Sequence, residues 1–498
     1  MIRRASTLVA LAAVACGGSP PEPSKLPPLP PVVAPPSAPT AAAGAPDRSK
    51  LPTPAPAPSF ALPRPKISAL SNGMKVYFVE QGPTPLVSVL LVVPRGASTD
   101  PKGKAGLTAL TIDMLDEGAG GKDALALSEE LQRLGTDYGG NADVDYVMLA
   151  INTIADSFDA SVTLLADIAQ KPAFDAKEFA RRKSQRIADA LAAESEPTSA
   201  RSIAMRKALF GDGYAGALAG GTRPTLGKLQ LADVKAHYAA LVVPEGAAFV
   251  VVGGVDQARA VKALEASFGS WKGSAKSKSA SVSSEKPDKA IFFVDYKDST
   301  QTALAIARRA PGEGTPDYFP AMVMSRVFGE AFTSRLNLNL REAKGYTYGA
   351  RSSFQRYKET GLFALAASVK RETTRASIDE SFKELRDLCA SRPISAQERA
   401  EAVGGLLLGF PGRFERGGDV AAQLANLPLY SRPDDWLEKW SDHVKAVSVE
   451  QANELAKGYC NPDEYVVVLA GDRKVVAPTL EGLDRKIRFF DAQGNPVK

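Results

Sequence analysis

Histidine and cysteine are scarce in this sequence, and this limits the chemistry that it could carry. The 498 residues include only two histidines, His237 and His443, although most protein zinc sites and many acid–base pairs use histidine. The three cysteines, Cys16, Cys389 and Cys460, form no Cys-x-x-Cys pair, which excludes a cysteine-rich zinc site. These counts constrain the chemistry more than any other feature of the composition.

The first cysteine stands at the end of an export signal. The N-terminus contains Arg3 and Arg4, then an apolar run from Leu8 to Ala15, then Cys16. This pattern is typical of a secretory signal peptide, and the run is too short to span a membrane. Its "AVAC" ending resembles a bacterial lipoprotein cleavage box, in which the cysteine becomes the acylated first residue; the alternative is an ordinary signal peptide with an incidental cysteine. Because Gly17 rather than aspartate follows, we expect an outer-membrane lipoprotein that faces the periplasm.

Export would place the two remaining cysteines in an oxidising compartment, where a disulfide can form. The sequence leaves the pairing of Cys389 and Cys460 open. We expect two separate buried thiols.

The charge balance gives little support to nucleic-acid binding. There are 61 lysines and arginines against 56 aspartates and glutamates, a formal net charge of +5, and the basic residues are scattered rather than grouped in a stripe. A hydrophobic share of 44% and a charged share of 23% are ordinary for a globular protein. The length indicates two domains with appendages.

The chain divides into a leader, a tether and two folded units. Residues 1–16 are the leader, and residues 17–65 hold nearly half of the 36 prolines and predict a disordered tether. A first domain is expected over residues 66–272 and a second over 290–485, separated by a small polar linker at 273–289 and followed by a tail at 486–498.

Periodicity predicts the elements of the first domain. Residues 66–81 give a hairpin signal around "SNG", and "LVSVLLVV" is suited to a strand buried on both faces. The stretch "GLTALTIDMLDEG" has apolar side chains three and four residues apart, which predicts a helix over 106–118. Further helices are expected over these ranges: 124–134, 157–170, 176–193 and 257–268.

The second half repeats the first. "GYTYG" at Gly345–Gly349 follows "GTDYG" at Gly135–Gly139 by 210 residues, and the strand pattern "EYVVVLAGD" answers "AAFVVVGGVD" at a similar offset. A near-constant offset over this distance indicates a duplicated domain rather than a short-period repeat. We therefore expect an α+β protein with two homologous α/β-roll domains, each a mixed sheet packed with helices.

These segments resemble the insulinase/pitrilysin (M16) metallopeptidase family and its mitochondrial processing relatives. The resemblance rests on "SNGMKVYFVE", on "RGAS" followed by "GLT" and "MLDEG", on "AAFVVVGGVD", and on "SRLNLNLREAKGYTYGA" in the second half, and it covers about residues 66 to 480. It implies a clam shell of two domains around an unfolded peptide. It also implies a zinc site on a His-x-x-Glu-His helix of the first domain.

The zinc motif is degenerate in this chain. Aligned on "GLTALTIDMLDEG", its two histidines fall on Ala109 and Asp113 and its glutamate on Ile112. Alanine and isoleucine carry no lone pair, and one aspartate is not a zinc site. The segment that matches the helix of the third ligand offers the carboxylates Glu178, Asp189 and Glu194, all of which could be plain solvated charges. We read both histidines as structural, so zinc hydrolysis by this chain alone is not expected.

The second half keeps the other part of the family pattern. Active members carry an arginine and a tyrosine that reach the substrate backbone and the scissile carbonyl, and "LREAKGYTYGA" maps them to Arg341 and Tyr348. A guanidinium and a phenol are donors suited to a developing oxyanion. We expect Gly345 to end the helix and Tyr346 and Tyr348 to share one face of the next strand. The alternative is an arginine in a surface ion pair and a tyrosine in the sheet core.

The resemblance implies that this chain is the non-catalytic subunit of a heterodimeric zinc peptidase. The chain would bind no cofactor, a homologous M16 partner would carry the zinc, unfolded peptide would be the substrate, and a lipid on Cys16 would hold the chain at the membrane. A pseudopeptidase that serves as a binding or assembly scaffold at the outer membrane is the alternative. A metallopeptidase with relocated ligands is a third.

Overall fold

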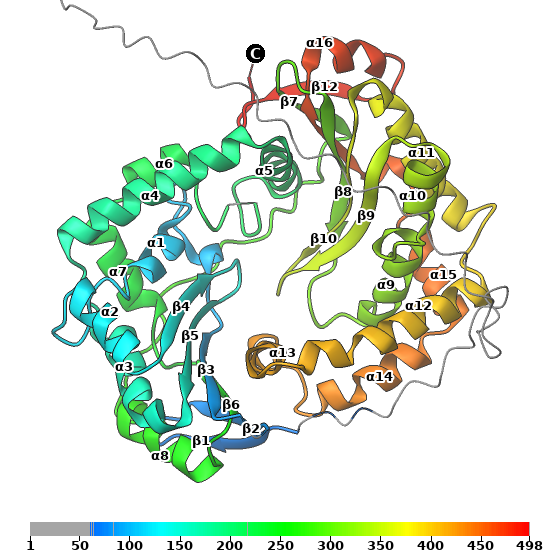
Figure 1. The fold of residues 1–498 in the computed structure, drawn as a ribbon. Coiled ribbons are helices and arrows are strands. Elements are labelled where there is room, and N and C mark those ends of the chain that lie inside the picture. Colours follow the sequence, from blue (N-terminus) through cyan, green and yellow to red (C-terminus); the bar gives the residue numbers. More distant parts are fainter. Residues whose placement is uncertain (1–59, 61, 63, 83, 217, 498) are drawn as a thin grey trace, which may run out of the picture. The chain divides into compact units, whose positions relative to one another are not determined.

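The computed structural model describes residues 60, 62, 64–82, 84–216 and 218–497. The leader, Cys16 and most of the predicted tether lie outside the described residues. The described chain forms two six-stranded mixed sheets packed with helices (Figure 1), and this confirms the α+β class and the duplication.

The first sheet has the strand order β1-β2-β6-β3-β5-β4. Its strands are β1 (Lys66–Ala69), β2 (Lys75–Glu80), β3 (Leu86–Val93), β4 (Asp137–Ala142), β5 (Val147–Ile154) and β6 (Ala248–Gly253). β2 and β6 are parallel, and all the other pairs are antiparallel. The predicted hairpin is β1–β2, turning at Gly73 with φ +87°. β3 is buried from Val87 onward, as predicted for a strand covered on both faces.

The second sheet repeats this order as β12-β7-β11-β8-β10-β9. Its strands are β7 (Ala290–Asp295), β8 (Gln301–Ala310), β9 (Thr347–Arg356), β10 (Gly361–Lys370), β11 (Val466–Gly471) and β12 (Lys486–Phe490). In the first sheet the edge strand next to β2 is β1, which comes first in the chain. In the second sheet the corresponding edge strand is β12, which comes last. The second domain was expected to end at residue 485, with residues 486–498 as a tail. That boundary was wrong, because Lys486–Phe490 pairs in parallel with β7.

The five helices predicted in the first half are present close to their predicted ranges, and α5, α6 and α7, for which no range was predicted, lie between the last two of them. They are α1 (Leu107–Asp113), α2 (Ala124–Arg133), α3 (Phe158–Gln170), α4 (Ala176–Ser195), α5 (Pro197–Phe210), α6 (Arg223–Lys228), α7 (Leu231–Leu241) and α8 (Gln257–Phe268). α1 is shorter than predicted. The N–H groups of Met114 and Leu115 bond three residues back, to Thr111 and Ile112, so the helix tightens into a turn while both apolar side chains stay buried.

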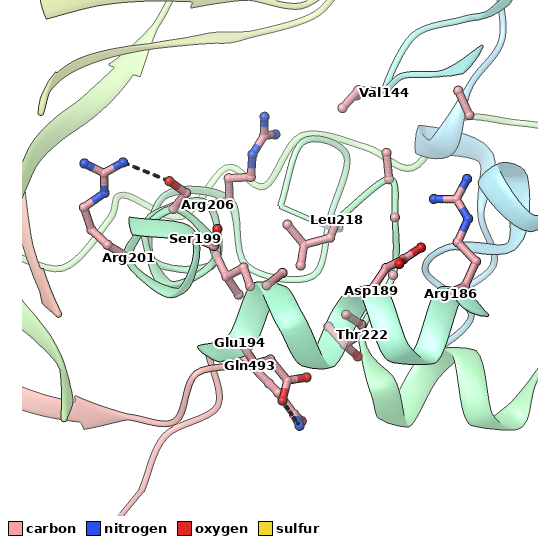
Figure 2. A pocket seen from close by; sticks show the side chains of 18 of the residues that line it. Val144, Arg186, Asp189, Glu194, Ser199, Arg201, Arg206, Leu218, Thr222 and Gln493 are labelled. Atoms are coloured by element: carbon pink, nitrogen blue, oxygen red, sulfur yellow. Dashed lines mark hydrogen bonds between the residues drawn. The ribbon is translucent and has the colours of Figure 1, made fainter. Parts of the chain in front are cut away.

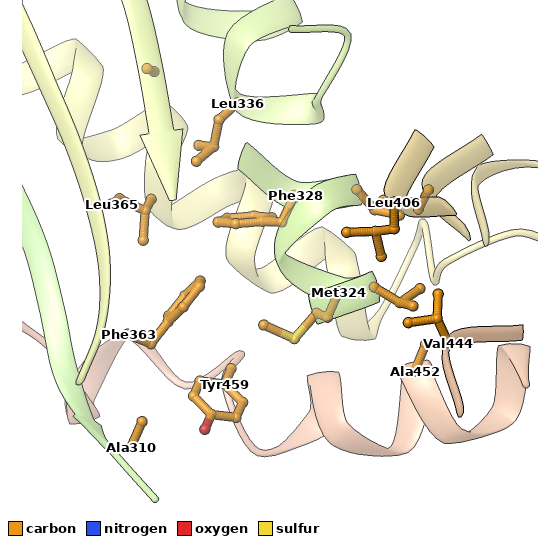
Figure 3. Packing of buried hydrophobic residues seen from close by; sticks show 14 of the residues in the cluster. Ala310, Met324, Phe328, Leu336, Phe363, Leu365, Leu406, Val444, Ala452 and Tyr459 are labelled. Carbon is orange, nitrogen blue, oxygen red and sulfur yellow. The ribbon is translucent and has the colours of Figure 1, made fainter. Parts of the chain in front are cut away.

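The helices of the second half build the larger core. They are α9 (Tyr318–Ser325), α10 (Arg335–Asn337), α11 (Thr374–Cys389), α12 (Ala396–Gly409), α13 (Gly417–Leu429), α14 (Trp436–Ala446), α15 (Val449–Lys457) and α16 (Arg473–Val476). Two wide helical turns, η3 (Arg326–Glu330) and η4 (Leu338–Ala343), accompany them. Figure 3 shows part of this core, where Met324 and Phe328 lie between the sheet residues Phe363 and Leu365 and the helix residue Leu406.

Each half lends one helix to the sheet of the other. α5 packs on β8 and β11, where the alanines of the second sheet, among them Ala303 and Ala305, leave room for Ala204 and Phe210. α13 packs on β3 and β6 of the first sheet, with Leu424 in the same core as Leu90 and Val250. The two halves therefore share their hydrophobic cores.

The structure pairs the two cysteines that the sequence analysis kept apart. Cys389 ends α11, Cys460 follows α15, and the two form a disulfide with their Cα atoms 6.1 Å apart. The expectation of two separate thiols was wrong. α11 and α15 pack together, which brings positions 71 residues apart within disulfide range.

Candidate functional site

The three degenerate zinc positions lie on α1, and none of them offers a free metal ligand. Ala109 and Ile112 are buried among apolar neighbours. Asp113 is bound by Arg186 of α4, with Nε 2.5 Å from Oδ2 and Nη2 2.7 Å from Oδ1. Both carboxylate oxygens therefore already accept from a guanidinium. These positions do not fit a zinc ion.

Two more carboxylates and two more arginines extend this pair along the α1–α4 interface. The buried Glu117 binds both Arg181 and Arg182, and Asp116 lies 3.8 Å from Arg182. Burial raises the pKa of Asp116 to about 6. A ladder of charge-assisted hydrogen bonds joins the two helices.

Two of the three remaining candidate ligands form ion pairs with arginines. Glu178 binds Arg181 at 2.6 Å, and the buried Glu194 binds Arg223 at 2.6 Å. Hydrogen bonding to Asp113 raises the pKa of Arg186, and the nearby charge of Asp189 adds to this. Within the described residues, no three histidine, cysteine, aspartate or glutamate side chains are grouped so that they could hold a metal ion.

A cavity of about 560 Å³ lies beside this network. Figure 2 shows Arg186 and Asp189 from α4, Arg206 from α5 and Thr222 around it. Its lining mixes arginines with carboxylates, so it is suited to a polar ligand. Gln493, from the segment predicted as a tail, also lines it and lies 3.3 Å from Glu194.

Arg341 and Tyr348 lie on the surface of the second half. Arg341 is half-buried in η4, and Tyr348, the second residue of β9, is 91% exposed. η4 and β9 pack against each other, so the two residues belong to neighbouring elements. Tyr348 is not in the sheet core, which removes that part of the alternative interpretation. The Arg341–Glu342 contact is long, at 3.4 Å.

The local backbone differs in one respect from the expectation. Gly345 has φ +63° and its N–H bonds to the Arg341 carbonyl, so it ends the helical turn as predicted. Tyr346 precedes β9 and packs against the core, whereas Tyr348 points into solvent. The expectation that the two tyrosines share one face was wrong, because β9 begins only at Thr347.

Both histidines have structural surroundings. The Nε2 atom of His237 lies 2.8 Å from the Thr108 hydroxyl and 3.5 Å from Asp100, which also accepts from the first N–H groups of α1. Burial lowers the pKa of His237 to about 4 and raises that of Asp100 to about 6. His443 is exposed on α14 and stacks on Phe319.

Sequence reasoning missed Arg186 and Phe332, and only the first left a signal. Asp113 and Glu117 are four residues apart within the helix predicted over 106–118, and Arg182 and Arg186 are four apart within that predicted over 176–193, so complementary charges recur at helical spacing in the sequence. Phe332 precedes the mapped arginine by nine residues, and nothing in the sequence links the two. Its ring lies 4.4 Å from the Arg341 guanidinium carbon.

Among the residues that the structure describes, no helix combines the length and the apolar character needed to cross a membrane.

Comparisons with known proteins agree on one family. The profile described as "Insulinase (Peptidase family M16)" matches residues 75–220, and that described as "Peptidase M16 inactive domain" matches residues 228–406. The "Non-peptidase homolog YmxG" of Helicobacter pylori is 20% identical over 80% of this chain and 92% of that protein. "Mitochondrial-processing peptidase subunit beta" of Lentinula edodes is 22% identical over 82% of this chain and 90% of that protein. The crystal structure of a peptidase M16 inactive domain from Pseudomonas fluorescens is similar with a TM-score of 0.76 and 25% identity, covering 82% of this chain and 98% of that one.

Proposed function

Because the chain belongs to the peptidase M16 family and its zinc-helix positions hold no ligand set, we propose that it is the non-catalytic subunit of a two-chain zinc peptidase. It would hold unfolded peptide for a homologous M16 partner that carries an intact His-x-x-Glu-His helix. One combination of features carries the proposal: Asp113 is neutralised by Arg186, while Tyr348 and the guanidinium of Arg341 remain on the surface.

Arg341 and Tyr348 would both bind the peptide at the scissile bond, each in a different way. Zinc on the partner would polarise the carbonyl and supply an activated water. The Arg341 guanidinium would donate to the carbonyl oxygen as negative charge develops there, and the Tyr348 hydroxyl would donate as a neutral partner. Arg341 lies over the ring of Phe332 in a cation–π contact and makes only a long ion pair, 3.4 Å, with its neighbour Glu342.

Support for a partner comes from the similarity to a processing peptidase that is named as a subunit. The proposal also places the chain at the outer membrane, facing the periplasm, through acylated Cys16 and the proline-rich segment up to residue 65. The disulfide between Cys389 and Cys460 suits an oxidising compartment.

The test is reconstitution. The full chain is purified alone and with an M16 homologue from the same genome that has an intact zinc motif, and cleavage of a fluorogenic unfolded peptide is followed. We expect no cleavage by this chain alone and cleavage by the pair. Arg341→Ala should lower kcat/KM of the pair on the order of 10²-fold, the usual loss for one oxyanion donor.

Matched variants separate the roles. Arg351→Ala removes another exposed arginine from β9 and should leave the rate unchanged. Tyr348→Phe removes only the hydroxyl and should lower the rate of the pair without weakening subunit association. Full activity of the Arg341→Ala and Tyr348→Phe pairs would refute the assigned roles, and stoichiometric zinc bound to this chain alone would refute its non-catalytic place.

The scaffold function is the second candidate, and the relative named "Non-peptidase homolog" favours it. The α1–α4 ladder also supports this candidate, because arginines of α4 occupy Asp113 and Glu117 with ion pairs. A complex that assembles with the zinc-bearing homologue yet cleaves no faster than the homologue alone would favour the scaffold.

A further inference from the structure

We propose that Phe332 is a positioning residue that holds the Arg341 guanidinium in the orientation in which it binds peptide; this inference rests on the function proposed above. Phe332 is 66% exposed, which is unusual for a phenylalanine in a chain with large cores. Its ring packs against the side chain of Arg341, whose guanidinium carbon lies 4.4 Å from the ring centroid. This distance is well inside the range of a cation–π contact.

The contact gives the arginine a defined place. An arginine on an exposed helical turn loses rotamer freedom when it binds a ligand. An aromatic face beneath the guanidinium restricts those rotamers in advance, while the edge N–H groups stay available as donors. The competing carboxylate, Glu342 Oε1, is 3.4 Å from Nη1 and makes only a weak pair.

A buried asparagine fixes Phe332 relative to the strand that carries Tyr348. Asn337 is 5% exposed, its Nδ2 donates to the Phe332 carbonyl at 2.7 Å, and its Oδ1 accepts from the Ala350 N–H at 3.3 Å. One side chain thus links the backbone beneath the Phe332 ring to β9, two residues from Tyr348. Breaking either hydrogen bond would leave a buried polar group of Asn337 without a partner, which costs free energy. Asn337 therefore keeps the Phe332 backbone and β9 at a fixed separation.

Residues 336–340, which link Phe332 to Arg341 in the chain, are also anchored in the hydrophobic core. Leu336 and Leu340 are fully buried on either side of Asn337, and Figure 3 shows Leu336 in the cluster with Phe328 and Leu365. The Thr347 hydroxyl donates to the Ser368 carbonyl at 2.7 Å and fixes the start of β9. Phe332 and Arg341 therefore lie on a fixed base rather than on a loose loop.

The experiment is a double-mutant cycle on the full chain in detergent. Fluorescein-labelled β-casein, an unfolded polypeptide, is the probe, and its anisotropy reports binding. Phe332→Leu keeps an apolar side chain but removes the ring, and it should weaken binding about two- to five-fold, the usual range for an exposed cation–π contact. Phe332→Tyr keeps the ring and should bind as the wild type does.

The coupling decides the role. In an Arg341→Gln background, Phe332→Leu should have no further effect, because there is no guanidinium left to position. An equal loss in both backgrounds would overturn the proposal, since Phe332 would then contact the peptide by itself. Leu338→Ala, at an exposed site of the same segment, is the control and should have the same effect in both backgrounds.

A second measurement does not depend on binding. In protein labelled with ¹³C-arginine, the ring current of Phe332 should shift the Arg341 methylene protons upfield, and the signal is assigned by its loss in Arg341→Gln. The shift should vanish in Phe332→Leu and persist in Phe332→Tyr and Leu338→Ala. If Arg341→Gln leaves casein binding unchanged, the proposed function fails and the positioning role fails with it. If Arg341→Gln weakens binding but the wild type shows no ring-current shift, the proposed function stands and the positioning role alone is overturned.

Discussion

Replacing Arg186 by methionine tests whether a guanidinium now does the structural work of a metal ion between α1 and α4. The change keeps the length and apolar stem of the side chain but leaves the Asp113 carboxylate without its two donors. The side chains of Asp113 and Arg186 are only 20% and 29% exposed. Breaking a fully buried pair costs about 3–5 kcal/mol and an exposed pair under about 1 kcal/mol, so we expect a loss of about 2 kcal/mol here.

The loss should appear locally. Amide hydrogen exchange of α1 and α4, followed by mass spectrometry, should accelerate about 30-fold, which corresponds to about 2 kcal/mol of local opening. Arg133→Met is the matched control, because Arg133 makes the same two-bonded contact with Glu130 at the solvent-exposed surface of α2. It should leave exchange nearly unchanged.

The double variant completes the test. Asp113→Asn removes the charge that Arg186 neutralises, so Arg186→Met should cost much less in that background. Equal losses in both backgrounds would refute the idea that the pair acts as a unit. The reasoning would also fail if EDTA lowered the melting temperature of the wild type, since the helices would then depend on a metal.

Three further predictions concern other groups. His237→Gln should be less stable than the wild type at neutral pH, and this difference should shrink as the pH falls. The pKa of His237 is lowered from 6.5 to about 4, so the stability that the neutral imidazole gives the wild type is full above pH 6.5 and is lost towards pH 4. The free energy of unfolding in urea should show a loss of about 3 kcal/mol over this range. The raised pKa of Asp100, about 6, acts in the opposite direction, because the stability that it contributes is lost as the pH rises from 4 through 6. The variant itself should therefore become more stable as the pH falls from 6 to 4. A pH-independent gap between wild type and variant would contradict the His237 assignment, and a variant that gains no stability below pH 6 would contradict the Asp100 assignment. Serine at both Cys389 and Cys460 should lower stability by up to about 4 kcal/mol, because the disulfide closes a loop of 71 residues, and dithiothreitol should destabilise the wild type but not this variant. Cys16→Ser should abolish incorporation of radiolabelled palmitate and move the chain from the membrane to the soluble fraction, whereas labelling that survives would refute lipidation.

The sequence predicted those features whose signal is local. The α8 helix, Gln257–Phe268, was predicted to the residue because its apolar spacing and the cap at Asp256 agree. β12 was missed because "KIRFF" is short and half polar, and only its pairing with β7 makes it a strand. The disulfide was missed for a similar reason, since it depends on the packing of α11 against α15.

The candidate site divides in the same way. Ala109, Ile112 and Asp113 could be identified as positions that lack ligands, because a motif is a matter of residue type and spacing. The partner of Asp113 could not be identified, since the Asp113–Arg186 contact joins residues 73 apart. The exposure of Tyr348 also required the structure, because period-two alternation does not say which face of an edge strand is covered.

The exchange of α5 and α13 has a consequence for how the chain is made. The face of the first sheet that carries Leu90 and Val250 packs against α13, whose last residue is Leu429. During synthesis, that face must therefore wait until α13 has emerged before the helix can bury it. A first half that folded earlier would leave an apolar face open to aggregation. The first sheet is thus completed late, together with the second half of the chain.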